Sequence, residues 1–96
     1  MLPKDYRLTR SSDFGRVYAE GQSWANGMLV LYKAHSGLSQ SRFGFSVSRR
    51  IGKAVVRNRT KRLMREAVRS FLDLVQPGWD VVLIARRGMV GADYRA

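Results

Sequence analysis

The chain contains no cysteine and a single histidine, His35, and both facts exclude whole classes of protein. Without cysteine there can be neither a disulfide framework nor a thiolate metal site. One histidine cannot form a histidine cluster, and Asp13, Asp73 and Asp80 do not have the spacing of a catalytic carboxylate pair. We therefore expect no catalytic residues and no metal site in the protein itself.

Long apolar runs are also absent. No stretch approaches the roughly 18 residues needed to span a bilayer, and the first ten residues do not have the apolar segment of a secretory signal. The sequence predicts a cytoplasmic protein with no membrane partner. With 96 residues, 45% of them hydrophobic, we expect one folded domain over residues 1–96.

Acidic residues are few beside basic ones. The chain has 18 Lys and Arg against 7 Asp and Glu, a net charge of +11. Ten of the basic residues and one acidic residue, Glu66, lie between Arg42 and Arg69, so this segment carries +9 of the total. A charge this concentrated indicates a polyanionic partner.

The pattern of apolar residues predicts an α+β fold, a small α-β sandwich with a mixed sheet and the order α-β-β(-β)-α-β. The expected elements are a helix with Ser11 or Ser12 as its N-cap and Gly21 as its stop, strands at 28–34 and 42–48, a long helix at 54–75 and a strand at 80–85. Residues 20–27 and 35–41 read as turn and loop. We expect the first two strands to form a hairpin and the last strand to run parallel to its neighbour.

The long helix has two distinct faces at a helical period of about 100° per residue. The core-facing side is predicted to hold Val56, Thr60, Leu63, Met64, Ala67, Val68, Phe71, Leu74 and Val75. The opposite side holds Asn58, Arg59, Lys61, Arg62, Arg65, Glu66 and Arg69. Arg57 falls at the margin of the apolar side, from which it could turn toward the sheet.

A solvated helix face would normally alternate positive and negative residues. Here Lys61 and Arg65, and Arg65 and Arg69, are like-charge pairs at i, i+4. Arginine binds phosphate through two parallel hydrogen bonds, which favours nucleic acid over a lipid surface. Neutralising about six phosphates would give a log–log salt slope of roughly −4 to −5.

Aromatic residues form a second candidate group. Phe14, Tyr18 and Tyr32 could stack unpaired bases beside a polar strand face that holds Ser46 and Ser48, which we expect near the basic helix. Ordinary core packing is the alternative for each ring.

The stretch RFGFSVSRRIGKAVVRNRTKRLMREAVR, residues 42–69, strongly resembles the protein subunit of bacterial ribonuclease P. Its R-N-R motif falls at Arg57, Asn58 and Arg59, followed by Lys61, Arg62 and Arg65. The segments LTRSSDFGRVYAEG, LVLYKA and WDVVLIARRG extend the resemblance over about residues 6–90.

The resemblance implies a non-catalytic subunit of an RNA-based endonuclease that removes the 5′ leader of precursor tRNA. The protein would bind no cofactor, and the magnesium ions would be used by the RNA subunit. Its expected partners are the ribonuclease P RNA and precursor tRNA. The residues implied to bind the catalytic RNA are Arg57, Asn58, Arg59, Lys61, Arg62 and Arg65. A cleft between helix and sheet, lined by Phe14, Tyr18, Tyr32, Ser46 and Ser48, would bind the leader. Arg49, Arg50, Lys53 and Arg69 add a further basic patch.

The chain departs from the family's pattern at its end. Members continue past the last strand into a C-terminal helix, whereas this sequence stops at Ala96, so the helix is expected to be missing or truncated. An uncovered sheet would then favour self-association.

Two other functions stay open at this stage. A general RNA-binding or ribosome-assembly protein would share the composition but not the order of motifs. A protein-only nuclease is disfavoured by the absence of a carboxylate and histidine constellation.

Overall fold

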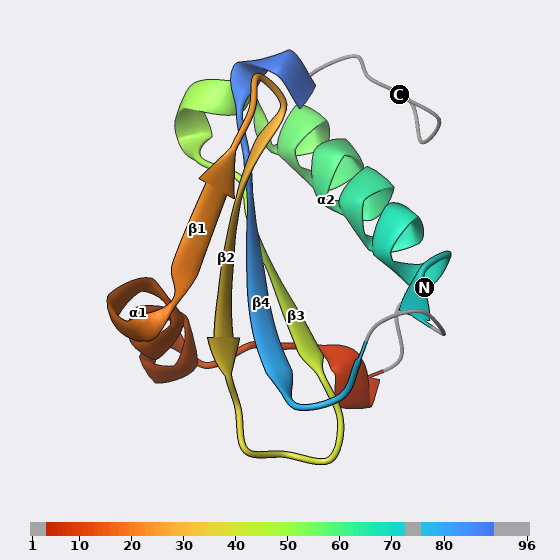
Figure 1. Cartoon of the computed structure of the whole chain (residues 1–96). Coiled ribbons are helices and arrows are strands. Elements are labelled where there is room, and N and C mark those ends of the chain that lie inside the picture. The colour runs from red at the N-terminus through yellow and green to blue at the C-terminus, as the bar shows by residue number, and fades with distance from the viewer. Residues whose placement is uncertain (1–3, 73–75, 90–96) are drawn as a thin grey trace.

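A computed structural model describes residues 4–72 and 76–89 of the chain (Figure 1). The elements, in order, are η1 (Lys4–Tyr6), α1 (Ser11–Glu20), β1 (Gln22–Ala25), β2 (Leu29–His35), β3 (Arg42–Ser46), η2 (Arg49–Ile51), α2 (Ala54–Arg69), β4 (Trp79–Ala85) and η4 (Arg87–Met89), where η marks a 3-10 helix. The predicted α+β class is confirmed.

The four strands form one mixed sheet in the order β1-β2-β4-β3. β4 pairs antiparallel with β2 and parallel with β3, with Leu31 opposite Leu83 and Phe45 opposite Leu83 on the other side. The parallel pairing is confirmed, but the predicted β2–β3 hairpin is wrong because β4 lies between them. β4 is apolar on both faces and buried along most of its length, which suits a strand between two others. β3 alternates apolar with small or polar residues and lies at the edge of the sheet.

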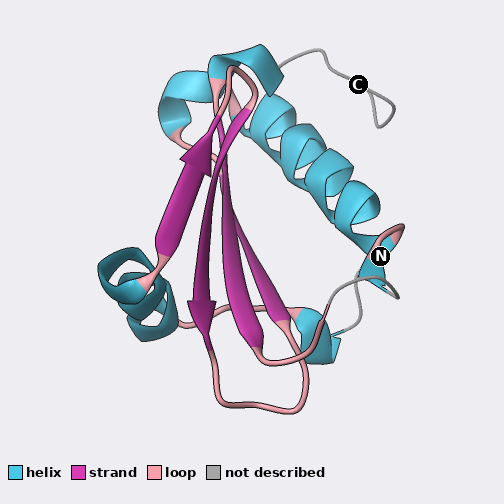
Figure 2. Ribbon diagram, in the orientation of Figure 1, coloured by secondary structure: helices cyan, strands magenta, loops and turns pink. Residues whose placement is uncertain are grey.

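The two helices cover opposite faces of the sheet, as the ribbons show (Figure 2). On the α2 side, Met64 and Leu63 pack with Phe43, Val81 and Leu83. On the α1 side, Val17 and Phe14 pack with a second cluster that contains Leu8, Ala34 and Val82. Alternation along β4 therefore sends neighbouring side chains into two separate cores.

α1 begins and ends differently from the sequence-based expectation. Arg10 occupies the N-cap without a side-chain hydrogen bond, so the predicted serine cap is wrong. Gly21 does end the helix, but in an extended conformation, with φ −82° and ψ 158°. A Cβ there would approach Val17 O to 2.5 Å and Lys33 O to 2.9 Å, so glycine is required by close approach of the backbone.

The segment 20–27 is not only a turn, because it contains β1, an exposed edge strand. Asn26 closes the β1–β2 hairpin by accepting hydrogen bonds from the backbone N–H groups of Met28 and Leu29, at 2.8 and 3.0 Å. The residues of β1 are exposed on both faces of the strand, so β1 does not have the apolar alternation that would identify a strand in the sequence.

α2 ends at Arg69, so the predicted extension is wrong for residues 70–72, and residues 73–75 lie outside the described part of the chain. The Phe71 N–H bonds Val68 O at 2.9 Å, an i to i−3 contact that tightens the turn. Phe71 consequently lies 56% exposed instead of in the core. Thr60 and Met64 are buried as expected.

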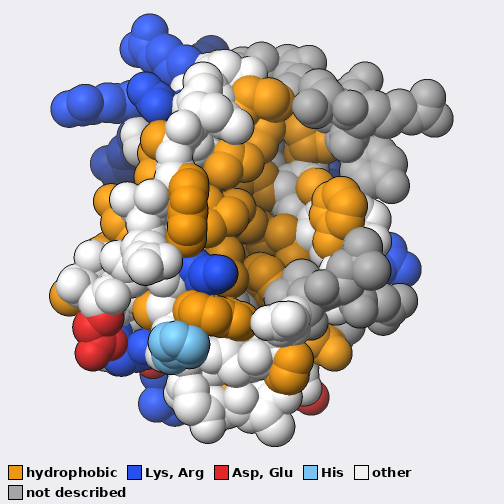
Figure 3. Space-filling view, in the orientation of Figure 1, with side chains coloured by type: hydrophobic (Ala, Val, Ile, Leu, Met, Phe, Trp, Pro, Cys, Tyr) orange, Lys and Arg blue, Asp and Glu red, His pale blue; other side chains and the backbone are white. Residues whose placement is uncertain are grey.

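Hydrophobic side chains gather on the sheet face between β1 and α2 (Figure 3). Residues 90–96, where the family's C-terminal helix was expected to begin, lie outside the described residues, and self-association through this face stays a prediction. None of the described helices has the length and apolar character needed to cross a membrane.

Asp80, at the start of β4, is fully buried and joins three elements. Arg42 of β3 donates to it through Nε at 2.9 Å and Nη2 at 2.7 Å, and Arg16 of α1 binds the same carboxylate. The hydrogen bonding of Arg42 to Asp80 raises the pKa of Arg42, and burial lowers it by a smaller amount. This cluster fixes α1 to the end of the sheet where β3 and β4 begin.

We expect Asp80→Asn to lower the free energy of unfolding by about 3 kcal/mol, because it removes the one buried carboxylate that both partly buried arginines share and leaves them only their more exposed partners, Glu20 and Asp13. Glu20→Gln is the matched control, since Glu20 also pairs with Arg16, at 3.5 Å, but its side chain is 62% exposed. That change should cost no more than about 0.5 kcal/mol. Denaturant unfolding measures both, and equal effects would contradict the assigned importance of the buried carboxylate.

Candidate RNA interface

The cationic face of α2 is defined here as Asn58, Arg59, Lys61, Arg62, Arg65 and Arg69. Asn58, Arg59, Arg62 and Arg69 are exposed, whereas Lys61 and Arg65 are half-buried. Glu66 lies on the same side and pairs with Arg69 at 3.5 Å. The predicted separation of charge from core is therefore present on this helix.

Arg57 differs from the other cations of the helix. It is half-buried, and its Nε is enclosed without a hydrogen-bond partner in the described structure. The half-burial agrees with the position predicted for Arg57 at the margin of the apolar side, and its turn toward the sheet stays a prediction. An enclosed donor without a partner raises the free energy of the folded state.

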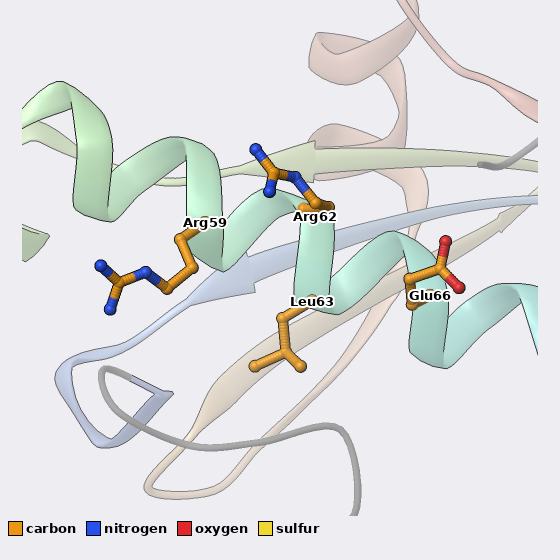
Figure 4. A pocket seen from close by; sticks show the side chains of 4 residues that line it. All are labelled: Arg59, Arg62, Leu63 and Glu66. Carbon is orange, nitrogen blue, oxygen red and sulfur yellow. The ribbon is translucent and has the colours of Figure 1, made fainter.

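A hollow of about 460 Å³ opens beside α2 (Figure 4). Among the described residues it is lined by Arg59, Arg62, Leu63 and Glu66. Arg59 and Leu63 point to the same side of the helix, and Arg62 leaves the helix in a different direction. The two guanidinium groups can bind a phosphate and the leucine can contact its sugar or base, whereas the Glu66 carboxylate in the same lining opposes an anion.

The aromatic surface, Phe14, Tyr18, Tyr32 and Ser46, joins side chains from α1, β2 and β3. The Tyr18 ring centroid lies 6.4 Å from that of Phe14 and 5.1 Å from that of Tyr32, the latter edge to face. Tyr18 is 41% exposed, so part of this residue is open to a ligand. The structure thus brings together four of the five residues predicted for leader binding.

Burial raises the pKa of the Tyr18 phenol, and the neighbouring Tyr32 raises it further. A hydrogen bond with the Ser46 side chain acts in the opposite direction and is the smaller effect. The phenol therefore stays neutral through the physiological range and adds no negative charge to this surface.

Gly44 of β3 permits the close approach of Phe14. A Cβ at Gly44 would lie 2.5 Å from Cζ and 2.8 Å from Cε1 of the Phe14 ring. The ring therefore rests against strand backbone where any side chain would displace it.

Two parts of the predicted leader site are corrected by the structure. Ser46 contacts Tyr18 of α1, so the polar face of β3 lies on the α1 side of the sheet and not beside the basic helix. Ser48 lies beyond the end of β3, and its Oγ accepts the Arg50 N–H at 3.0 Å. It caps η2 because the strand stops two residues earlier than its alternation suggested.

Sequence reasoning missed the residues that hold these surfaces in place, Gly44, Arg42 and Asp80. The available signal was Asp80 itself, a carboxylate at the start of a strand that is otherwise apolar and buried. Such a residue requires a cationic partner. His35 was expected in a loop, but it ends β2 and stacks on Trp79, with ring centroids 4.0 Å apart.

The described residues contain no group of three or more His, Asp or Glu side chains that could hold a metal ion. The basic patch residues Arg49, Arg50 and Lys53 are exposed on η2 and just before α2.

Comparison with known proteins gives one consistent family. A family model described as Ribonuclease P matches residues 2–96. The ribonuclease P protein component of Caldanaerobacter subterraneus subsp. tengcongensis is 43% identical over 94 residues, which cover 98% of this chain and 81% of that protein. The corresponding component of Clostridioides difficile is 44% identical over 89 residues, covering 92% and 78%.

Solved structures agree with the sequence comparison. The RNase P protein of Staphylococcus aureus superimposes with a TM-score of 0.86 at 33% identity and covers 94% of this chain and 83% of its own. The RNase P protein from Thermotoga maritima gives a TM-score of 0.84 at 33% identity, covering 93% and 84%.

Two glycine-to-alanine changes should have opposite effects on stability. Gly44→Ala forces the Phe14 ring away and should lower the free energy of unfolding by about 1–3 kcal/mol. Gly15→Ala, in α1, meets nothing within 4 Å and should raise it by about 0.5–1 kcal/mol. Thermal or denaturant unfolding of the two variants tests the pair, and a neutral Gly44→Ala would contradict the close packing.

The Tyr18 phenol should ionise above the ordinary tyrosine value of about 10. Its raised pKa means that it contributes to stability below the unfolded pKa and loses that contribution as pH rises through the folded pKa. The difference between the tyrosinate absorbance titrations of the native protein and of Tyr18→Phe isolates this group. A midpoint at or below the ordinary value would contradict its burial against Tyr32.

Proposed function

The chain belongs to the ribonuclease P protein family, and from this membership we propose that it assists the removal of the 5′ leader from precursor tRNA. Membership makes it a partner of ribonuclease P RNA in a holoenzyme. The proposal goes further and assigns each surface of the protein to one RNA. In this role the chain acts as a single domain, in the cytoplasm.

The observation that carries the assignment is the placement of the two surfaces on opposite sides of one sheet. α2 packs with one core cluster, and the aromatic surface belongs to the helix and strands around the other. A protein that must hold two RNA molecules at once needs two surfaces that do not compete. The sheet between them supplies that separation.

The cationic face of α2 and Arg57 bind the catalytic RNA in this proposal. Exposed guanidinium groups at Arg59 and Arg62 flank a hollow, which suits the phosphate backbone of a folded RNA. No base-specific reading is required of these residues, because phosphate contacts fix position and orientation.

The aromatic surface binds the single-stranded leader. An unpaired base can stack on the exposed part of Tyr18 or Phe14, and stacking tolerates any base. Such a site accepts leaders of different sequence, which a general tRNA-processing enzyme requires.

The chemistry belongs to the RNA subunit and its magnesium ions. The protein contributes charge: at +11 it lowers the repulsion between two polyanions that otherwise meet only at high salt. The protein should therefore matter most at low salt and low magnesium.

A general RNA-binding protein is the second candidate. It would use the same cations but would not distinguish a precursor tRNA with a leader from the mature tRNA. Dependence of affinity on the leader separates the two functions.

The proposed function is tested by cleavage of a precursor tRNA by a bacterial ribonuclease P RNA at low salt and low magnesium. Adding this protein should restore cleavage at the mature 5′ end. Arg57→Ala combined with Arg59→Ala should weaken the rescue by at least tenfold, because about two phosphate contacts are lost. Tight RNA binding without rescue would contradict the function.

Binding of the leader by the aromatic surface is tested separately. Tyr18→Ala should weaken holoenzyme affinity for precursor tRNA by about five- to a hundredfold, since stacking of one base contributes roughly 1–3 kcal/mol. Tyr18→Phe is the control, because it keeps the ring and loses only the hydroxyl. Affinity for mature tRNA should not change in either variant, and an equal loss for mature tRNA would place Tyr18 elsewhere in the complex.

A further inference from the structure

One end of the sheet carries basic residues that neither surface described above includes. β3 and β4 are parallel neighbours, with Ser46 opposite Ile84 near their ends. The carboxyl ends of parallel neighbours meet at the same edge of a sheet. The turns that follow them, η2 and η4, therefore lie at one edge, and both begin with arginine.

We propose that this edge, formed by Arg49, Arg50, Lys53, Arg86 and Arg87, is a second phosphate-binding surface that extends the contact of α2 with the catalytic RNA. The inference rests on the proposed function. It adds two residues to those proposed to bind RNA: Arg87, the first residue of η4, and Arg86, which directly precedes η4. Together with Arg49, Arg50 and Lys53 they form one surface.

The charge at this edge is of one sign. All five residues are exposed. The acidic residues of the described chain lie elsewhere: Asp5, Asp13, Glu20, Glu66 and Asp80. Asp80 in particular lies at the opposite end of β4, so the sheet has its buried anion at one end and its exposed cations at the other. Figure 3 shows Lys and Arg side chains projecting together at the upper left, the end where Figure 1 places η2.

η4 is held firmly against the β1–β2 hairpin. The Arg86 N–H donates to Met28 O at 2.9 Å, and its Nη1 donates to Asn26 O at 2.9 Å. A Cβ at Gly88 would lie 2.3 Å from Gly27 O, so the two turns touch through backbone, and Met89 is buried. Arg87 is thus presented from a fixed turn, without an ion-pair partner in the described structure.

η2 is fixed in a corresponding way by the Ser48 cap on Arg50. Ile51 and Met89 belong to the same apolar cluster as Val47 and Met64, which links both turns to α2. The edge is continuous with the start of α2 and lies away from α1. A folded RNA that contacts Arg59 can therefore continue across η2 to η4, whereas a leader on the aromatic surface belongs to the other face.

The test measures binding to the ribonuclease P RNA of Thermotoga maritima across a salt series. Arg87→Ala should weaken binding about fivefold at ~0.15 M salt and reduce the log–log salt slope by about 0.7 to 0.9, the effect of one lost phosphate contact. Arg50→Ala should act similarly, and the double variant should show the sum because the side chains come from separate turns.

Arg10→Ala is the matched control. It removes the same charge from an exposed position before α1 and should change neither quantity. Unfolding midpoints of all variants should match that of the native chain. If Arg87→Ala behaves as Arg10→Ala does, the second surface is overturned.

Precursor tRNA affinity of the assembled holoenzyme gives a further readout. It should be unchanged by Arg87→Ala at saturating protein. A loss there, with normal binding to the catalytic RNA, would assign the edge to the substrate and overturn the proposal. The native chain and the Arg57→Ala, Arg59→Ala variant, measured in parallel, report on the proposed function itself: no binding by the native chain would overturn that function, and not only the edge.

Discussion

The carboxylate of Asp80 is buried at the start of β4 and binds Arg42 of β3 and Arg16 of α1. Because the charges compensate one another within one cluster, the three elements are held in a fixed relation. The aromatic surface depends on that relation, because Phe14 and Tyr18 of α1 contact β2 and β3, which are not adjacent to α1 in the sequence. Among the described residues, the far end of β3 and β4 carries Arg49, Arg50, Lys53, Arg86 and Arg87 and no acidic side chain.

Much of the fold follows from local periodicity. The two faces of α2 and the buried run of β4 were visible because each depends on residues within one element. Neighbour relations were not visible in the same way. The hairpin predicted between β2 and β3 fits their sequences as well as the observed pairing does, and only competition from the more apolar β4 excludes it. β1 was missed because both of its faces are exposed, so no alternation marks it.

The candidate site divides along the same line. The cations of α2 could be assigned from the sequence because helical spacing alone gathers them. The aromatic residues could be proposed but not placed, since Phe14, Tyr18 and Tyr32 meet only through tertiary packing. Ser46 was predicted to lie on the α2 side of the sheet, but it contacts Tyr18 of α1 on the other side. Ser48 shows the limit most plainly: it is the last residue of the predicted alternation, but β3 ends two residues before it, at Ser46, and its hydroxyl caps η2.

β4 has one further consequence, which concerns the order of folding. It is the last strand along the chain and yet lies between β2 and β3, pairing with both. As the chain emerges during synthesis, β2 and β3 have no partner on their inner edges until residues 79–85 become available. The apolar stripe of α2 likewise has no completed sheet to cover. The protein therefore gains its core, the cationic face of α2 and the aromatic surface late and together, so a partly synthesised chain presents basic sequence without the fixed arrangement of these two surfaces.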